Sequence, residues 1–202
     1  MRRNSIFTVN YSKKTTEQGG IAFPLDKAND QQGLVILYTG NGKGKTSAAL
    51  GLALRALGHG HKVLIVQFIK GPWQSGEEKT LGQLSPAVEI MKTGRGFTWQ
   101  SEDLELDRSA AQEGWKIAWQ KVMEGGNDLV ILDELTYLIT YGMVDEAEVI
   151  RLIRERPRKT TLVITGRQAS PALFSAADLV TEMKEVKHPY SQGMAARQGI
   201  EF

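Results

Sequence analysis

A glycine-rich stretch contains the first residues in the chain whose types and spacing could perform chemistry. It reads Thr39, Gly40, Asn41, Gly42, Lys43, Gly44, Lys45, Thr46 and Ser47. Glycines let backbone N–H groups approach phosphate oxygens, and a helix that follows adds unpaired donors and the positive end of its dipole. A lysine neutralises phosphate charge, and a threonine hydroxyl can coordinate Mg²⁺. The stretch from Gly40 to Ser47 therefore predicts an ATP-binding phosphate loop in which Lys45 and Thr46 act in the chemistry.

The glycine spacing departs from the general phosphate-loop motif at one position. The motif would have glycine at position 39, where this chain has Thr39, and the glycines fall at positions 40, 42 and 44 instead. We therefore expect the loop to hold phosphates along a different path or in a different orientation. The alternative is a glycine-rich turn with two solvated lysines. It is disfavoured because an apolar strand pattern precedes the stretch and a helical pattern follows it.

Two carboxylates, Asp133 and Glu134, directly follow the apolar run Leu129–Leu132. In phosphate-loop proteins, a carboxylate at the end of such a strand lies beside the Mg²⁺ that bridges the phosphates. Taken alone, the pair could equally cap a helix over residues 136–141. Together with the glycine loop, it predicts that one of the two carboxylates binds the metal, directly or through water.

Side chains in three further loops could either contact a ligand or have an ordinary structural role. Phe97 and Trp99 lie in a glycine-flanked loop, where they either contact a flat ligand or fold back into the core. Lys70 follows an apolar run and either faces the site or is an ordinary loop residue. Arg167 follows another apolar run and either contacts phosphate or pairs with a surface acid.

Short apolar runs that alternate with helical stretches must position these residues. We expect strands over residues 34–38, 63–69, 88–91, 129–132, 161–164 and 180–186, and helices over residues 45–57, 106–123 and 145–154 and from Ser170 onward. Apolar strands separated by helices predict a single-domain α/β fold with a mostly parallel sheet and helices on both faces, as in RecA-like phosphate-loop NTPases. Ligands of such sheets gather at the carboxyl ends of the strands, where the loops named above lie.

Composition and charge limit the classes of function. The chain of 202 residues has no cysteine, which excludes disulfides, thiolate metal sites and a cysteine nucleophile. Its 25 Lys and Arg nearly balance 23 Asp and Glu, and the net charge of +2 argues against a nucleic-acid partner. No apolar run is long enough to cross a bilayer and no secretory signal is evident, so we expect a cytoplasmic protein without membrane contact.

Five motifs, at residues 40–46, 66–71, 96–99, 132–137 and 164–167, connect these observations. In these residues and in their order, the chain resembles the phosphate-loop family of ATP:corrinoid adenosyltransferases. The resemblance extends from about Leu34 to Phe202, and Thr39 is also typical of the family. It implies transfer of the 5′-deoxyadenosyl group of ATP to the cobalt of a reduced corrinoid, with release of triphosphate.

The resemblance also implies roles for individual residues. The nucleophile would be Co(I), so the protein would need only to position its substrates and neutralise charge. Thr46 and Glu134 would hold Mg²⁺, or Mn²⁺ in its place, with Asp133 adjacent to these ligands. Phe97 and Trp99 would lie under the corrin ring and displace the lower axial ligand of the cobalt. The family further implies a homodimer and a reduced flavoprotein as electron donor.

The polar residues 1–32 form an N-terminal arm before the phosphate-loop domain of residues 33–202. The arm is either a tail or a segment that orders on a partner or substrate, and one hypothesis makes it a lid over the corrinoid site. Two rival functions are kept for the domain. One is an ATPase or kinase that cleaves at the γ-phosphate with Glu134 and Arg167. The other is a RecA-like nucleic-acid motor or regulatory binding module.

Overall fold

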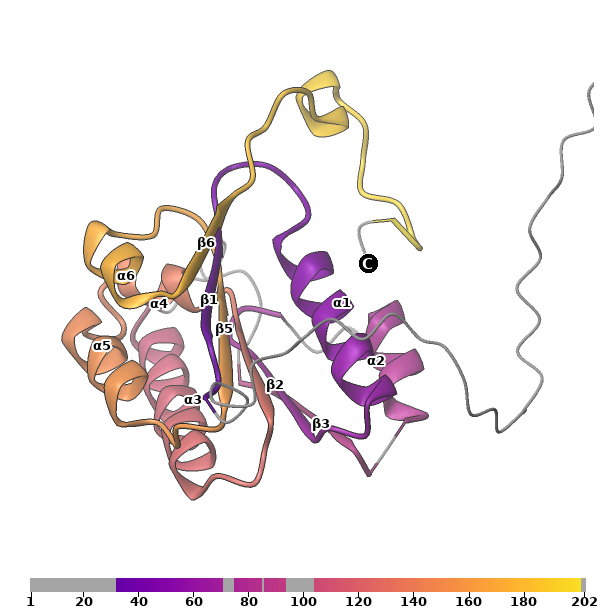
Figure 1. Cartoon of the computed structure of the whole chain (residues 1–202). Helices are drawn as coiled ribbons and strands as arrows, with labels where there is room; N and C mark the ends of the chain where they lie inside the picture. Colours follow the sequence, from indigo (N-terminus) through magenta and orange to yellow (C-terminus); the bar gives the residue numbers. More distant parts are fainter. Residues whose placement is uncertain (1–31, 71–74, 85, 94–103, 201–202) are drawn as a thin grey trace, which may run out of the picture. The chain divides into compact units, whose positions relative to one another are not determined.

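The computed structural model describes residues 32–70, 75–84, 86–93 and 104–200, and within them the chain forms one six-stranded parallel sheet (Figure 1). The strands are β1 (Val35–Thr39), β2 (Val63–Gln67), β3 (Val88–Lys92), β4 (Leu129–Asp133), β5 (Thr161–Thr165) and β6 (Leu179–Glu182). Their order across the sheet is β3-β2-β4-β5-β1-β6. Every neighbouring pair is parallel, so the carboxyl ends of all six strands lie at one edge.

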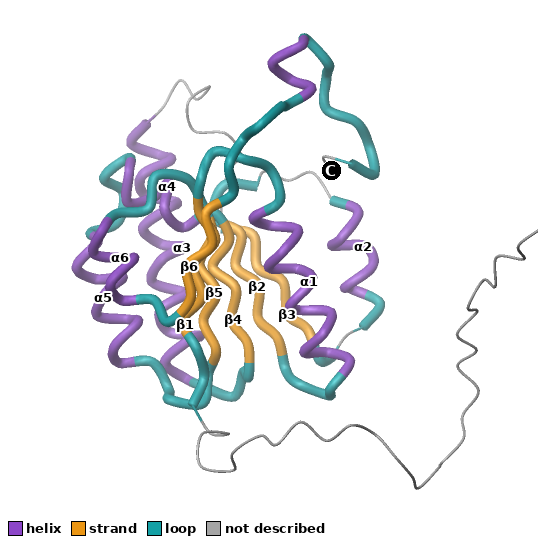
Figure 2. Tube along the Cα trace, turned by 45° about the horizontal axis from the view of Figure 1, so that its top comes forward, coloured by secondary structure: helices purple, strands orange, loops and turns teal. Residues whose placement is uncertain are grey.

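Helices cover both faces of the sheet (Figure 2). They are α1 (Lys45–Gly58), α2 (Gly76–Gly82), α3 (Leu104–Glu124), α4 (Leu135–Thr140), α5 (Glu146–Glu155) and α6 (Pro171–Ala176), followed by a 3₁₀ helix, η2 (Pro189–Gln192). Helices α1 and α2 pack on one face, and α3 to α6 pack on the other. Because strands such as β2 and β4 are buried on both sides, their sequences read as unbroken apolar runs. The α/β class with a parallel sheet and helices on both faces is therefore confirmed.

Local capping signals in the sequence form the helix ends that they predict. The Asp145 carboxylate accepts a hydrogen bond from the Ala147 N–H at 3.0 Å and begins α5. The Ser170 hydroxyl accepts one from the Leu173 N–H at 3.2 Å and begins α6. Both contacts satisfy N–H groups that the first turn of a helix leaves unpaired.

Several bounds differ from the expectation by one or two residues, such as the end of β2 at Gln67 instead of residue 69, and two elements differ by more. The last strand ends at Glu182 instead of residue 186. Among the described residues its only strand partner is β1, and β1 ends at Thr39, opposite Glu182. Helix α2 was not expected, although the sequence contains its signal. The Glu78 carboxylate accepts a hydrogen bond from the Ser75 N–H at 3.3 Å, as a serine followed three residues later by glutamate predicts.

None of the helices in the described part of the chain is long and apolar enough to cross a membrane. Residues 1–31, which hold nearly all of the expected N-terminal arm, lie outside the described residues.

Candidate active site

The glycine loop joins β1 to α1 at the carboxyl edge of the sheet, as the motif requires. It lines a cavity of about 540 Å³ together with residues from the loops after β2, β4 and β5. Among the lining residues are Lys45, Thr46, Lys70, Glu134, Arg167 and His188. The structure thus brings together the two sequence features, the loop and the acidic pair, that were expected to meet.

The unusual glycine positions have a structural cause in Met183, which directly follows β6. The Gly42 N–H donates a hydrogen bond to the Met183 carbonyl at 2.6 Å. A Cβ atom on Gly40 would lie 2.5 Å from the same carbonyl oxygen, and one on Gly42 would lie 2.8 Å from it. Gly40 also has φ of 92°, which side chains rarely adopt. Glycines at 40 and 42 therefore let the backbone after β6 pack directly on the loop.

Lys45 folds back over the loop. Its ammonium donates to the carbonyl of Gly40 at 2.7 Å and to that of Gly42 at 2.8 Å. Burial, followed by the positive charge of Arg167, lowers the pKa of Lys45. An ammonium has three donors, so two hold the loop and the third remains for a ligand in the cavity.

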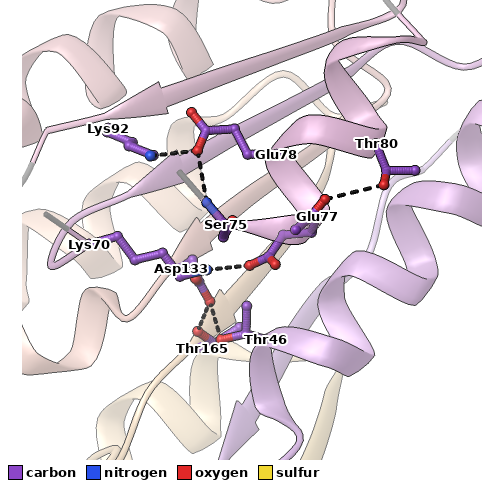
Figure 3. Close-up of polar contacts among 10 residues, drawn as sticks. Thr46, Lys70, Ser75, Glu77, Glu78, Thr80, Lys92, Asp133 and Thr165 are labelled. Atoms are coloured by element: carbon purple, nitrogen blue, oxygen red, sulfur yellow. Dashed lines mark hydrogen bonds and ion pairs between the residues drawn. The ribbon is translucent and has the colours of Figure 1, made fainter. Parts of the chain in front are cut away.

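Asp133, the last residue of β4, is the centre of a hydrogen-bond network (Figure 3). Its Oδ1 atom accepts from the hydroxyl of Thr46 at 2.9 Å and from that of Thr165 at 2.7 Å. The Thr165 hydroxyl also accepts from the Glu134 N–H at 2.8 Å. Burial raises the pKa of Asp133, although the two hydroxyl donors oppose this shift. The network ties the first turn of α1 to the ends of β4 and β5.

Glu134 turns the chain from β4 into α4. Its φ of 62° is left-handed, which is uncommon for a residue with a side chain, and its side chain lines the cavity. Burial, and next the negative charge of Asp133, raise the pKa of Glu134 to about 7. Adjacent carboxylates in a buried setting repel each other, so a bound cation would favour the ionised form of both.

The donor set fits Mg²⁺ bound together with a phosphate ligand. Asp133 is 1% exposed, and its Oδ2 atom has no hydrogen-bond partner. The described residues contain no group of three or more His, Asp or Glu that would form a complete metal site by themselves. Mg²⁺ does not need one, because it commonly binds through one or two carboxylates, waters and substrate phosphates. Thr46, Asp133 and Glu134 offer a hydroxyl and two carboxylates whose oxygen atoms can bind Mg²⁺ directly or through its waters.

The remaining candidate residues divide into those near the cavity and those outside the described residues. Lys70 lines the cavity and forms an ion pair with Glu77 of α2 (Figure 3). Arg167 also lines the cavity, and its carbonyl accepts from the Thr136 hydroxyl at 2.7 Å. The predicted corrinoid-contacting residues Phe97 and Trp99 lie outside the described residues.

Sequence reasoning missed the contribution of the chain after β6. His188 and Ile200 line the same cavity, and the Lys43 ammonium donates to the Ile200 carbonyl at 3.0 Å. The segment matches no general motif, and its position depends on β6 pairing with β1. The hydrogen-bonding role of Thr165 was also missed, although its place after an apolar run was a usable signal.

Comparisons with known proteins agree on the family. The model of the family described as ATP:corrinoid adenosyltransferase BtuR/CobO/CobP matches residues 31–202. A corrinoid adenosyltransferase of Escherichia coli (strain K12) is 43% identical over 176 residues, which cover 87% of this chain and 89% of that one. One of Pseudomonas aeruginosa is 42% identical, with 88% of both chains covered, and corrinoid adenosyltransferase CobA of Salmonella typhimurium is 40% identical, with 87% and 89% covered.

A solved structure supports the fold alone. The flagellar accessory protein FlaH from Methanocaldococcus jannaschii is similar with a TM-score of 0.52 and 16% identity, over 75% of this chain and 71% of that one. The family match spans the glycine loop, the Asp133 network and the segment after β6. This chain belongs to the ATP:corrinoid adenosyltransferase BtuR/CobO/CobP family.

Proposed function

We propose that this chain transfers the 5′-deoxyadenosyl group of ATP to the Co(I) centre of a corrinoid and releases triphosphate. The observation that carries the proposal is the cavity in which Lys45, Thr46 and Glu134 meet, in a chain of this family. The reaction needs no protein nucleophile, which agrees with a chain that has no cysteine.

The chemistry is a displacement at the ribose C5′ atom. An electron pair of Co(I) forms the cobalt–carbon bond, and the C5′–O bond breaks with its electron pair on the triphosphate. Negative charge therefore grows on the leaving group, where the Lys45 ammonium and the first turn of α1 can stabilise it. The protein accelerates the step by orientation and charge neutralisation, without proton transfer.

We assign Thr46 and Glu134 as ligands of Mg²⁺, or of Mn²⁺ in its place. When bound, this ion would neutralise triphosphate charge. The Oδ1 atom of Asp133 accepts a hydrogen bond from the Thr46 hydroxyl and so holds the Thr46 side chain at the start of α1. Its own burial makes Asp133 a rigid support at the end of β4, between β2 and β5.

The corrinoid side of the proposal rests on the family resemblance. Phe97 and Trp99 would lie under the corrin ring and remove the lower axial ligand, which makes reduction of Co(II) to Co(I) easier. A reduced flavoprotein would deliver the electron, two copies of the chain would form a dimer in the cytoplasm, and residues 1–32 would cover the corrinoid.

An anaerobic assay tests the function. Purified protein, Mg²⁺, ATP and chemically reduced cob(I)alamin are mixed, and the visible spectrum and the phosphate products are followed. We expect light-sensitive adenosylcobalamin together with triphosphate. Release of ADP without a spectral change would contradict the proposal and indicate an ATPase that cleaves at the γ-phosphate.

Two lysines of the glycine loop provide a matched pair of variants. Lys45→Ala removes an ammonium in the cavity that would contact the phosphates, and loss of one such preorganised donor lowers turnover by roughly 10²- to 10³-fold. Lys43→Ala removes a neighbouring charge whose ammonium bonds the Ile200 carbonyl instead, so we expect less than about a tenfold loss. Near-normal turnover of Lys45→Ala would refute the loop assignment.

A further inference from the structure

Polar side chains end three adjacent strands on the same face of the sheet. Gln67, Asp133 and Thr165 are the last residues of β2, β4 and β5. In β2 and β4, the residues two positions earlier, Ile65 and Ile131, belong to the core under α1. Because side chains alternate along a strand, the three polar side chains point to the α1 face, where Thr46 lies.

Gln67 stands directly beside Asp133, since the two are partners in the β2–β4 register. Its side-chain amide interacts with the Asp133 carboxylate and favours the ionised form of that group. Gln67 is only 2% exposed, yet its Oε1 atom has no hydrogen-bond partner. The Oδ2 atom of Asp133 is equally buried and equally without a partner.

Two buried acceptors without donors mark an incomplete arrangement. An unpaired buried acceptor is destabilising, and buried polar groups in proteins are normally paired with protein or water. The nearby hydroxyls of Thr46 and Thr165 already donate to the other oxygen of Asp133. Among the described residues, no hydrogen bond is donated to either atom, and a water molecule can supply two hydrogens.

We infer that Gln67 is a positioning residue for the metal that accompanies the nucleotide. Its Oε1 atom and the Oδ2 atom of Asp133 accept hydrogen bonds from a metal-bound water. The inference rests on the proposed function, because it requires Mg²⁺ next to Thr46 and Glu134. Mg²⁺ keeps several of its waters when it binds protein. Mutation of the groups that hold those waters commonly lowers metal affinity by 10- to 100-fold.

A neutral amide suits this position better than a further acid. Asp133 and Glu134 already place two carboxylates next to each other, and their repulsion is part of what raises the pKa of Glu134. Glutamine accepts a hydrogen bond from water without adding a third negative charge to the nucleotide-free protein. The same amide also opposes the rise in the pKa of Asp133 that burial causes.

The experiment measures the Mg²⁺ concentration that gives half of the thermal stabilisation by ATP. Gln67→Met keeps the size of the side chain and removes both of its polar atoms. We expect it to raise the half-saturating Mg²⁺ concentration by about tenfold or more. Ile65→Met is the matched control, because it changes a buried residue on the same face of β2, two positions from Gln67. It should lower the unfolding temperature and leave the Mg²⁺ requirement within about threefold of the unmodified chain.

Gln67→Glu provides a second measurement, which distinguishes a role in metal binding from a purely structural role of Gln67. Its carboxylate still accepts from a metal-bound water, so half-saturation should stay within about threefold of the unmodified chain or fall below it. The inference is overturned if Gln67→Met needs no more Mg²⁺ than Ile65→Met, or if Gln67→Glu is impaired as much as Gln67→Met.

The two proposals fail in different ways. If ATP stabilises the unmodified chain equally with and without Mg²⁺, the metal site fails and the Gln67 role fails with it. If Mg²⁺ is required and Gln67 behaves as expected, but the products are ADP and phosphate, the adenosyl transfer fails while the Gln67 role stands.

Discussion

Replacing Thr165 by valine tests whether the Asp133 network stabilises the fold. Thr165 is fully buried, and valine reproduces its shape with a methyl group in place of the hydroxyl. The change removes the 2.7 Å hydrogen bond to Asp133 (Figure 3). It also leaves the Glu134 N–H without the hydroxyl acceptor that it has at 2.8 Å. Nothing else in the site needs to move.

The expected loss of unfolding free energy follows from the two groups that lose a hydrogen bond, the Glu134 N–H and the Asp133 carboxylate. A buried backbone N–H without an acceptor costs about 1–3 kcal/mol, and a lost hydrogen bond to a charged group costs a further ~1.5–3 kcal/mol. Asp133 keeps the Thr46 hydroxyl on the same oxygen, which moderates the second loss. We expect Thr165→Val to lower the free energy of unfolding by about 3–4 kcal/mol. Thr165→Ser keeps the hydroxyl and loses one buried methyl group, for a loss of about 1 kcal/mol.

Urea unfolding of the three proteins, followed by fluorescence, measures both changes from the midpoints and slopes. Valine is more apolar than serine and more favourable in a strand, so hydrophobicity and strand propensity alone predict the opposite order of stability. If Thr165→Val is as stable as Thr165→Ser or more so, the argument from the network is refuted.

Three further changes test other parts of the structure. The pKa of Glu134 is about 7, above its ordinary value of 4.5, so the folded protein without ligand loses stability as pH rises from 4.5 to 7. Glu134→Gln should remove up to about 3 kcal/mol of that loss, as measured by thermal unfolding at each pH. Gly166→Ala should lower stability by more than about 3 kcal/mol, because its φ is 143° and the added Cβ would lie 1.9 Å from the Thr136 hydroxyl oxygen. Trp99→Ala should slow adenosylation that starts from cob(II)alamin more than adenosylation that starts from chemically made cob(I)alamin, because the resemblance assigns it to ligand displacement.

Each of these changes has a control or an opposing outcome. An unchanged pH profile for Glu134→Gln would contradict the buried acidic pair. Gly60→Ala, which has φ of 77° and no atom within 4 Å of the added Cβ, should cost only about 1 kcal/mol, and a Gly166→Ala loss no larger than this would contradict the close packing. Equal slowing of both adenosylation reactions would remove the proposed role of Trp99.

Features that depend on neighbouring residues in the sequence could be predicted. The start of α1 at Lys45, the caps at Asp145 and Ser170 and the apolar strands all follow from local rules of turn, cap and side-chain periodicity. The meeting of the glycine loop with Asp133 also followed, because carboxyl ends of parallel strands share one edge of the sheet.

Features that depend on strand order could not be predicted. The bond between Thr165 and Asp133 exists because β5 lies next to β4, and the contact of Met183 with Gly42 exists because β6 lies next to β1. The apolar strands have similar sequences and fit many orders equally well, so periodicity does not select one. The short range of β6 was likewise set by the length of its partner.

The position of β5 has a consequence for synthesis of the protein on the ribosome. β5 is the fifth strand along the chain, yet it lies between β1 and β4 in the sheet. The glycine loop and the acidic pair are therefore translated early but cannot reach their final spacing until β5 has emerged and inserted between their strands. A nascent chain that ends before Thr161 lacks both β5 and β6, so β1 has no strand partner and β4 keeps one unpaired edge. Unpaired strand edges are prone to wrong pairing and aggregation, so we expect this intermediate to depend on chaperones.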